Sequence, residues 1–114
     1  WVERLLPFAF LRAVAQGFVQ QGAKASGGVI SFGVPGGRDT VSSLLDHFRM
    51  ISIATHVADA RSCTLYPAGT THRQLTEEQL EEAGVGIDLV RLSCGIENTA
   101  DIIADLDQAL AAVQ

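Results

Sequence analysis

Lysine is almost missing from this 114-residue sequence, which has Lys24 alone beside seven arginines spread along the chain. With a net charge of −5 and no basic stripe, the sequence does not favour a nucleic-acid partner. Long apolar runs are missing too, because polar residues and a proline interrupt the apolar stretch 5–19, which is too short and too polar for a transmembrane span. Neither glycine pair, 27–28 or 36–37, lies in a phosphate-loop pattern of the type G-x-x-x-x-G-K-S/T or G-x-G-x-x-G. Both pairs are therefore interpreted as turn glycines, and we expect no nucleic-acid and no membrane partner.

Cysteine and histidine are scarce, and their spacing matches no metal site. Cys63 and Cys94 lie in apolar, strand-like runs without C-x-x-C spacing, so we expect buried, reduced thiols, with a disulfide as the less favoured alternative. His47, His56 and His72 form no recognised ligand or catalytic constellation. We therefore predict no metal site and a protein compatible with the cytoplasm.

Length and apolar patterning favour one compact domain. A chain of 114 residues, 47% of them hydrophobic, can bury one core. The predicted helices cover residues 8–21, 39–48, 76–84 and 98–113, and the predicted strands cover residues 28–34, 51–53, 62–66 and 89–96. This order predicts an α/β fold of the α+β type, in which a small sheet has helices mainly against one face.

Capping residues predict where the helices begin. Helix caps are expected at Asp39 or Thr40, at Thr76, and at Asn98 or Thr99. The clearest of these is the capping box of Thr76 with Gln79, in a short helix that Gly84 ends.

Apolar stripes predict which side chains are buried. The inward positions of the second helix are Val41, Leu44, Leu45 and Phe48. Those of the last helix are Ile102, Ile103, Leu106, Ala109, Leu110 and Val113, opposite Asp101, Asp105 and Gln108. In the strand 89–96 the packed face is predicted to carry Val90, Leu92, Cys94 and Ile96.

Arg91 is a cation inside an apolar strand, on the face opposite the packed one. A guanidinium is always charged and presents a planar fork suited to a carboxylate, so Arg91 is a candidate clamp for an amino-acid substrate. From the residues alone, a surface or salt-bridged arginine at a sheet edge is the favoured alternative. Glu97 precedes a predicted helix, where the helix dipole stabilises a carboxylate, and we expect that role rather than catalysis.

Two segments carry a family resemblance. The segments Tyr66-Pro-Ala-Gly-Thr-Thr-His-Arg-Gln-Leu75 and Val90-Arg-Leu-Ser-Cys-Gly-Ile-Glu97 resemble the patterns H-P-A-S-T-T-H and R-L-S-x-G-x-E of the Cys/Met-metabolism pyridoxal-phosphate (PLP) enzymes. The resemblance implies that residues 1–114 are one carboxy-terminal small domain of a longer enzyme, with the mostly antiparallel sheet of the aspartate-aminotransferase (type I) PLP fold. It also implies PLP as cofactor, bound mainly by a large domain that this sequence does not contain. The Schiff-base lysine belongs to that domain, so no catalytic residue is expected in this chain.

The resemblance assigns roles to individual residues. It implies that Arg91 binds the substrate α-carboxylate and that Thr71 and His72 shape a loop near the active site. His56 is aligned where the family has an Asn or Ser close to the substrate, and is therefore a candidate substrate-binding residue. The sequence departs from the family pattern at three further positions: Ala58 replaces a common Gly, Gly69 replaces a common Ser, and Cys94 replaces a common Val.

Two further segments are similar to a subgroup. Ser31-Phe-Gly-Val-Pro-Gly-Gly37 and Val57-Ala-Asp-Ala-Arg-Ser62 resemble F-G-V-K-G-G and V-G-D-A-K-S of O-acetylhomoserine sulfhydrylases. This implies homocysteine synthesis from O-acetyl-L-homoserine and sulfide or a thiol. The same tail is shared by O-succinylhomoserine sulfhydrylase, cystathionine γ-synthase and methionine γ-lyase, which stay open as alternatives.

The sequence also leads to expectations about oligomeric state and about the behaviour of the isolated chain. The resemblance implies a homotetrameric parent enzyme. The isolated chain is expected to be inactive and to self-associate through apolar surface at Val2, Leu5, Leu6 and Phe8. The alternative of another class is a stand-alone, non-catalytic α/β binding module, which the missing lysine domain favours.

Overall fold

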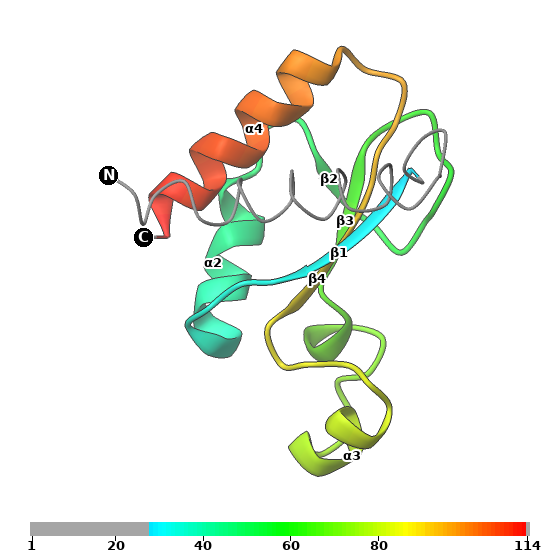
Figure 1. Ribbon diagram of the computed structural model, residues 1–114, viewed down its shortest axis with the longest axis vertical. Helices are drawn as coiled ribbons and strands as arrows, with labels where there is room; N and C mark the ends of the chain where they lie inside the picture. Colours follow the sequence, from blue (N-terminus) through cyan, green and yellow to red (C-terminus); the bar gives the residue numbers. More distant parts are fainter. Residues whose placement is uncertain (1–27, 114) are drawn as a thin grey trace, which may run out of the picture.

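The computed structural model describes residues 28–113. In chain order its elements are β1 (Val29–Gly33), α2 (Gly37–His47), β2 (Ser52–Ile53), β3 (Cys63–Leu65), the 3-10 helix η1 (Pro67–Gly69), α3 (Glu77–Glu82), β4 (Leu89–Ser93) and α4 (Thr99–Ala112). From residue 28 onward this is the predicted order, with η1 added (Figure 1). The predicted helix 8–21 and the apolar residues Val2, Leu5, Leu6 and Phe8 lie outside the described residues.

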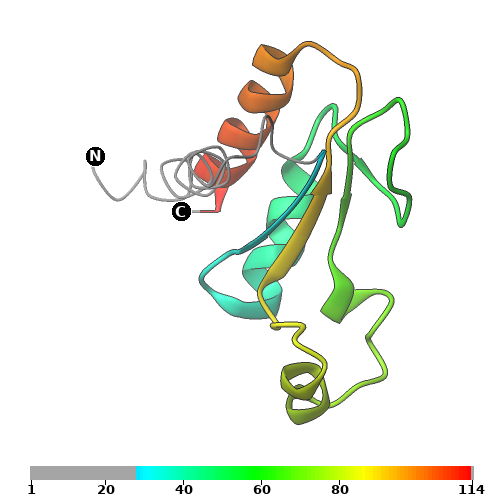
Figure 2. The same cartoon turned by 45° about the vertical axis from the view of Figure 1, so that its right-hand side comes forward.

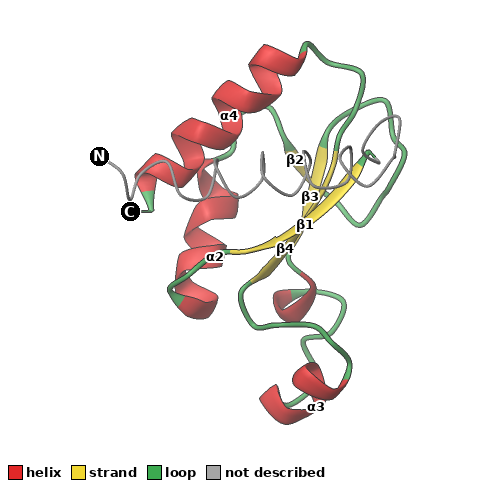
Figure 3. Ribbon diagram, viewed as in Figure 1, coloured by secondary structure: helices red, strands yellow, loops and turns green. Residues whose placement is uncertain are grey.

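The strands form one 4-stranded sheet with the order β1-β4-β3-β2. β4 pairs antiparallel with both β1 and β3, whereas the short edge strand β2 runs parallel to β3 (Figure 3). Figure 2 shows α2 and α4 together on one side of the sheet and the connection from β2 to β3 on the other. The predicted fold class, a small and mostly antiparallel sheet with helices mainly on one face, is confirmed.

The core lies between the sheet and the two helices α2 and α4. Val41 and Leu44 of α2 and Val90 of β4 are fully buried, and Leu45 and Leu92 nearly so. Val41, Leu44 and Leu45 are therefore inward as predicted, whereas Phe48 follows the end of α2 and is half-buried against the core. Because these side chains come from different elements, the core joins α2 to the central strands.

The start of α2 differs from the prediction. Its N-cap is Gly36, with φ of 120°, so the helix begins at Gly37, before the predicted caps Asp39 and Thr40. A φ in this region favours glycine, and Gly36 therefore permits the sharp entry into the helix. Thr40 instead donates a hydrogen bond from Oγ1 to the Gly36 carbonyl at 3.0 Å.

The start of α3 is as predicted. Thr76 Oγ1 accepts from the Gln79 N–H and Gln79 Oε1 accepts from the Thr76 N–H, which together form the capping box. The helix ends before Gly84, which has φ of 71°.

In α4 two residues, Ile103 and Asp105, have the opposite of the environments that were predicted for them. Asn98 caps the helix as predicted, accepting from the Ala100 N–H at 2.9 Å. Ile103, predicted to be inward, is 39% exposed, whereas Asp105, predicted to be outward, is buried. The reason is that Asp105 accepts the N–H groups of residues 49–51 at 2.8–2.9 Å, at the point where the chain leaves α2 for β2.

β4 is shorter than predicted. It ends at Ser93, and Ile96, predicted to pack, is 87% exposed. The reason is that residues after 93 leave the sheet: Cys94 N–H still donates to the Gly28 carbonyl, but Ile96 N–H donates to the carbonyl of Ala60 in the β2–β3 connection. The alternation of packed and outward-facing side chains along the strand therefore stops where the pairing of β4 with β1 stops.

Candidate functional site

Arg91 lies in the middle of β4, on the face of the sheet opposite α2 and α4. Ser31 of β1 and Leu65 of β3 are its direct neighbours across the sheet, so their side chains share its face. Arg91 is half-buried, and its Nη2 donates to the Thr55 carbonyl at 2.9 Å. Among residues 28–113, no carboxylate forms an ion pair with it. The guanidinium is therefore held at one nitrogen, and within this part of the chain its charge is not neutralised.

The connection between β2 and β3, residues 54–61, supplies that carbonyl and is tied to the sheet in its middle. The N–H of Ala58 donates to Ser93 Oγ at 3.2 Å, which joins the connection to the end of β4. Ala58 has φ of 58°, where a residue with a Cβ is strained. Ala58 thus keeps a backbone conformation that suits glycine, the residue common in the family at this position.

His56 lies in the same connection, one residue after the carbonyl that Arg91 contacts. Its side chain is 69% exposed, and Nδ1 lies 3.9 Å from Asp59 Oδ2. The N–H of Arg61 donates to Asp59 Oδ1 at 3.0 Å and holds the pKa of Asp59 below its usual value. Arg91 therefore contacts the loop that carries His56, at the residue next to it in the sequence.

Thr71 and His72 lie in the turn that follows η1. Thr71 Oγ1 and His72 Nδ1 are 2.8 Å apart, and the His72 N–H donates to the Pro67 carbonyl at 2.9 Å. Within residues 28–113, neither residue has a hydrogen bond to Arg91 or to the β2–β3 connection. No hydrogen bond in this part of the chain therefore joins Thr71 or His72 to Arg91 or His56, and their role beside the active site stays a prediction.

Tyr66, the residue before η1, and Gly69, the last residue of η1, depend on each other sterically. A Cβ on Gly69 would overlap the Tyr66 ring, which is buried and donates from its hydroxyl to the Ile87 carbonyl at 2.7 Å. Burial raises the pKa of Tyr66. Gly69 is therefore the residue that a tyrosine at position 66 requires in this turn.

Glu97 has a contact that the sequence did not indicate. Its Oε1 accepts the Ser62 N–H at 2.7 Å, and its Oε2 accepts the Ser62 hydroxyl at 2.8 Å. The Ser62 N–H is the main cause that holds the pKa of Glu97 below its usual value. The predicted role at the helix dipole is therefore replaced by a bond to the start of β3, and no spacing in the sequence pairs residues 62 and 97.

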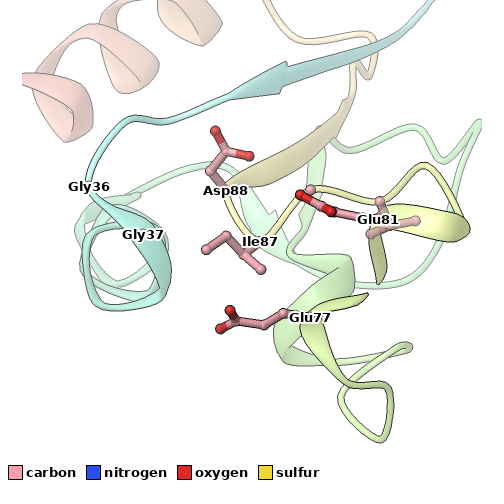
Figure 4. Close-up of a pocket in the computed structure, with 8 residues that line it drawn as sticks. Gly36, Gly37, Glu77, Glu81, Ile87 and Asp88 are labelled. Carbon is pink, nitrogen blue, oxygen red and sulfur yellow. The ribbon is translucent and has the colours of Figure 1, made fainter. Parts of the chain in front are cut away.

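A separate pocket of about 320 Å³ lies between the start of α2, the helix α3 and the residues before β4. It is lined by Gly36, Gly37, Glu77, Glu81, Val85, Gly86, Ile87 and Asp88. Figure 4 shows Glu77 projecting from α3 toward the start of α2. No predicted site residue lines this pocket, and its three carboxylates would repel an anionic substrate or phosphate group.

Two negative findings apply to residues 28–113. No group of three or more His, Cys, Asp or Glu residues there could hold a metal ion, and both Cys63 and Cys94 are free thiols. No helix in the same part of the chain has the length and the apolar character needed to cross a membrane.

Comparison with known proteins decides the family. A model described as Cys/Met metabolism PLP-dependent enzyme matches residues 9–111. The chain belongs to this family. O-acetyl-L-homoserine sulfhydrylase 1 of Thermus thermophilus is 40% identical over 85 residues, which cover 75% of this chain and 20% of that protein. L-methionine gamma-lyase of Fusobacterium nucleatum is 42% identical over 87 residues, which cover 76% and 22%.

A solved structure agrees with the family model and with the two relatives. A Campylobacter jejuni protein described as an O-acetylhomoserine (thiol)-lyase, with a pyridoxyl-lysine group, has a TM-score of 0.70 at 36% identity and covers 77% of this chain and 21% of its own. This confirms the expected type I PLP fold. The chain spans about a fifth of the length of the curated relatives it matches. Relatives named for different reactions have nearly the same sequence identity to this chain. The comparisons therefore identify the family but not one reaction within it.

The described residues do not fit a complete site for PLP. Residues 28–113 contain no lysine, so they cannot supply the amine to which the family's cofactor is joined. The pocket beside α3 is acidic and does not suit a phosphate. What this part of the chain offers is Arg91, a half-buried cation for which the only hydrogen bond within residues 28–113 is the one from Nη2 to the Thr55 carbonyl.

Proposed function

We propose that residues 1–114 are the single carboxy-terminal small domain of a longer PLP-dependent enzyme, in which Arg91 binds the α-carboxylate of the amino-acid substrate. The observation that carries this proposal is the display of Arg91 away from α2 and α4, with no ionic partner within residues 28–113. Family membership over residues 9–111 supports it, and so does the coverage of about a fifth of the relatives.

The physical basis of the clamp is the guanidinium fork. Nη2 is occupied by the Thr55 carbonyl, which leaves the other N–H donors for a carboxylate. Because Thr55 and the sheet hold the group in place, little side-chain entropy is lost when the substrate binds. Arg91 would thus bind and orient the substrate, and proton movement would fall to groups outside residues 28–113.

The proposed reaction is that of an O-acetylhomoserine sulfhydrylase. Sulfide or a thiol would replace the acetyloxy group of O-acetyl-L-homoserine, giving homocysteine (or its thioether) and acetate. The similarity of segments 31–37 and 57–62 to this subgroup supports the assignment, as does the Thermus thermophilus relative. Cystathionine γ-synthase, O-succinylhomoserine sulfhydrylase and methionine γ-lyase are the alternatives within the family.

His56, Thr71 and His72 complete the proposed site. An exposed imidazole can donate or accept a hydrogen bond, and His56 lies next to the residue that positions Arg91, which supports substrate contact. The Thr71–His72 pair would shape the turn after η1 where it meets the rest of the enzyme.

The proposal extends to cofactor, assembly and location. PLP, held mainly by the large domain, would supply the electron sink of the reaction. The chain alone would be inactive and would self-associate, the parent enzyme would be a homotetramer, and the free thiols Cys63 and Cys94 fit a cytoplasmic setting.

The test is expression from the complete reading frame, followed by absorbance spectroscopy with PLP and assays of product. Homocysteine formed from O-acetyl-L-homoserine and sulfide would support the proposed reaction. A preference for O-succinylhomoserine or cysteine, or cleavage of methionine, would select one of the alternatives. A reading frame without a lysine-bearing domain and without PLP absorbance would leave the non-catalytic binding module.

A further inference from the structure

Loop 54–61 carries the carbonyl that holds Arg91, and hydrogen bonds hold the loop at both ends. At its first end, the N–H groups of Ser52 and Ala54 donate to the carbonyls of Ser62 and Thr64, both at 3.0 Å. At its second end it meets the segment 94–97 that leaves β4. The position of the Thr55 carbonyl therefore depends on both attachments.

The second attachment is a compact network of hydrogen bonds. Glu97 accepts both the N–H and the hydroxyl of Ser62, at 2.7 and 2.8 Å, and Ser62 Oγ in turn accepts the Gly95 N–H at 2.9 Å. The Ile96 N–H donates to the Ala60 carbonyl at 2.9 Å. We call these residues, Ser62, Gly95 and Glu97, the Ser62–Glu97 clasp.

The clasp is closed and closely packed. Ser62 is fully buried, and both its hydroxyl and its N–H are paired with the carboxylate of the half-buried Glu97. A Cβ on Gly95 would overlap the Ala60 carbonyl and lie 2.5 Å from the carbonyl carbon of Arg61, so the two segments approach as closely as backbone allows. Removing the Glu97 carboxylate would leave buried donors unpaired and would release this end of the loop.

A short stretch of backbone connects the clasp to Thr55, the residue that contacts Arg91. Ala58 lies between the clasp and Thr55, and its N–H is held by Ser93 Oγ, one residue before the segment that forms the clasp. Its strained φ of 58° persists only where the surroundings impose it. Loosening the clasp would let Ala58 relax and would move the Thr55 carbonyl away from Arg91 Nη2.

We infer that Glu97, acting through Ser62, is a positioning residue for substrate binding, because the clasp holds loop 54–61 in the conformation that orients Arg91. The inference rests on the proposed function of Arg91. Glu97 itself does not touch the substrate in this account. Its effect is transmitted by the backbone from residue 62 to residue 55.

The experiment uses the complete enzyme with PLP bound, in the variants Glu97→Ala, Glu97→Gln, Ser62→Ala and Arg91→Ala, with Glu82→Gln as the matched control on exposed α3. Hydrogen–deuterium exchange is measured over residues 54–62, and steady-state kinetics are measured with O-acetyl-L-homoserine and sulfide. For Glu97→Ala we expect exchange of residues 54–62 to rise about tenfold, with α2 and α4 unchanged. We expect the KM for the amino-acid substrate to rise about tenfold, with kcat and the KM for sulfide within about twofold.

The decisive comparison is the double variant Glu97→Ala/Arg91→Ala. If Glu97 acts through Arg91, the added Glu97 change leaves the KM of Arg91→Ala unaltered, whereas independent structural damage would multiply the two effects. Glu97→Gln keeps one acceptor oxygen and should fall between Glu97→Ala and wild type. If the Glu97→Ala variant does not fold, the same measurements on Glu97→Gln still test the inference.

Besides multiplied effects in the double variant, two further results would overturn the inference in distinguishable ways. If Arg91→Ala raises KM while Glu97→Ala and Ser62→Ala leave it at the wild-type value, the clasp has no positioning role and the proposed function stands. If Arg91→Ala itself leaves KM unchanged, the proposed function fails and the inference fails with it.

Discussion

Arg91 donates a hydrogen bond from Nη2 to the carbonyl of Thr55, a residue 36 positions earlier in the sequence. The contact joins the central strand β4 to the loop that also carries His56. It holds Nη2 of the guanidinium against the β2–β3 connection, which lies on the side of the sheet opposite α2 and α4 (Figure 2). A cation fixed in this way has the preorganisation that a carboxylate clamp requires.

Substituting Ala58 with glycine should stabilise the 114-residue chain. Ala58 has φ of 58°, and glycine removes the steric cost of that conformation while losing more entropy on folding. We expect a net gain of about 0.5–1 kcal/mol in the free energy of unfolding, measured by urea titration. Ala60→Gly, in the same loop but without a positive φ, is the control and should destabilise. A loss of stability in Ala58→Gly would contradict the described loop conformation.

Substituting Gly69 with serine should destabilise the chain, because the new Cβ would overlap the buried Tyr66 ring. We expect a cost of about 1–3 kcal/mol in urea titration. The same substitution should cost less in a Tyr66→His background, where the smaller ring leaves space. Equal costs in both backgrounds would show that the ring does not exclude a side chain at position 69.

Asp105 should make stability depend on pH in the acidic range. Burial would raise the pKa of Asp105, but the N–H donors of residues 49–51 outweigh it and hold the pKa below its usual value. A carboxylate with a depressed folded-state pKa contributes stability that is present above its unfolded pKa and is lost as pH falls through the folded one.

Asp105→Asn should therefore lower the free energy of unfolding at pH 7 by about 2–3 kcal/mol and flatten its decline below pH 4. Asp107→Asn, on the exposed side of the same helix, is the matched control. If the two variants have the same pH profile, Asp105 does not hold the α2–β2 connection through its charge.

Substituting His56 tests whether the loop reaches the substrate. In the complete enzyme, His56→Ala should raise the KM for O-acetyl-L-homoserine about three- to tenfold, the effect of one lost hydrogen bond. His56→Asn, which restores the residue type common in the family, should keep KM near the wild-type value. An unchanged KM in His56→Ala would exclude substrate contact.

Local signals in the sequence predicted much of the fold. The box of Thr76 and Gln79 marked the start of α3, and the apolar spacing of Val41, Leu44 and Leu45 marked the buried face of α2. Capping and amphipathic periodicity act within a few residues, so they can be read without tertiary information.

The errors at Asp105, Ile96 and Glu97 have a tertiary cause, unlike the error at the start of α2, which has a local cause in the backbone conformation of Gly36. Asp105 is buried because backbone donors from more than fifty residues earlier need an acceptor, and Ile96 is exposed because Ala60 takes its segment out of the sheet. The Ser62–Glu97 bond likewise joins residues 35 positions apart. Arg91 could be identified from the sequence, but its contact with Thr55 could not, because a loop conformation decides it.

The measurement that tests the central claim most directly is the steady-state kinetics of Arg91→Ala in the complete enzyme, beside wild type and Arg91→Lys. We expect kcat/KM for O-acetyl-L-homoserine to fall by the equivalent of about 2–4 kcal/mol, mainly through KM. Absorbance of bound PLP should persist, and Arg91→Lys should recover only part of the loss because it keeps the charge but not the fork. A wild-type KM in Arg91→Ala, with PLP bound, would contradict the assignment of Arg91 as the carboxylate clamp.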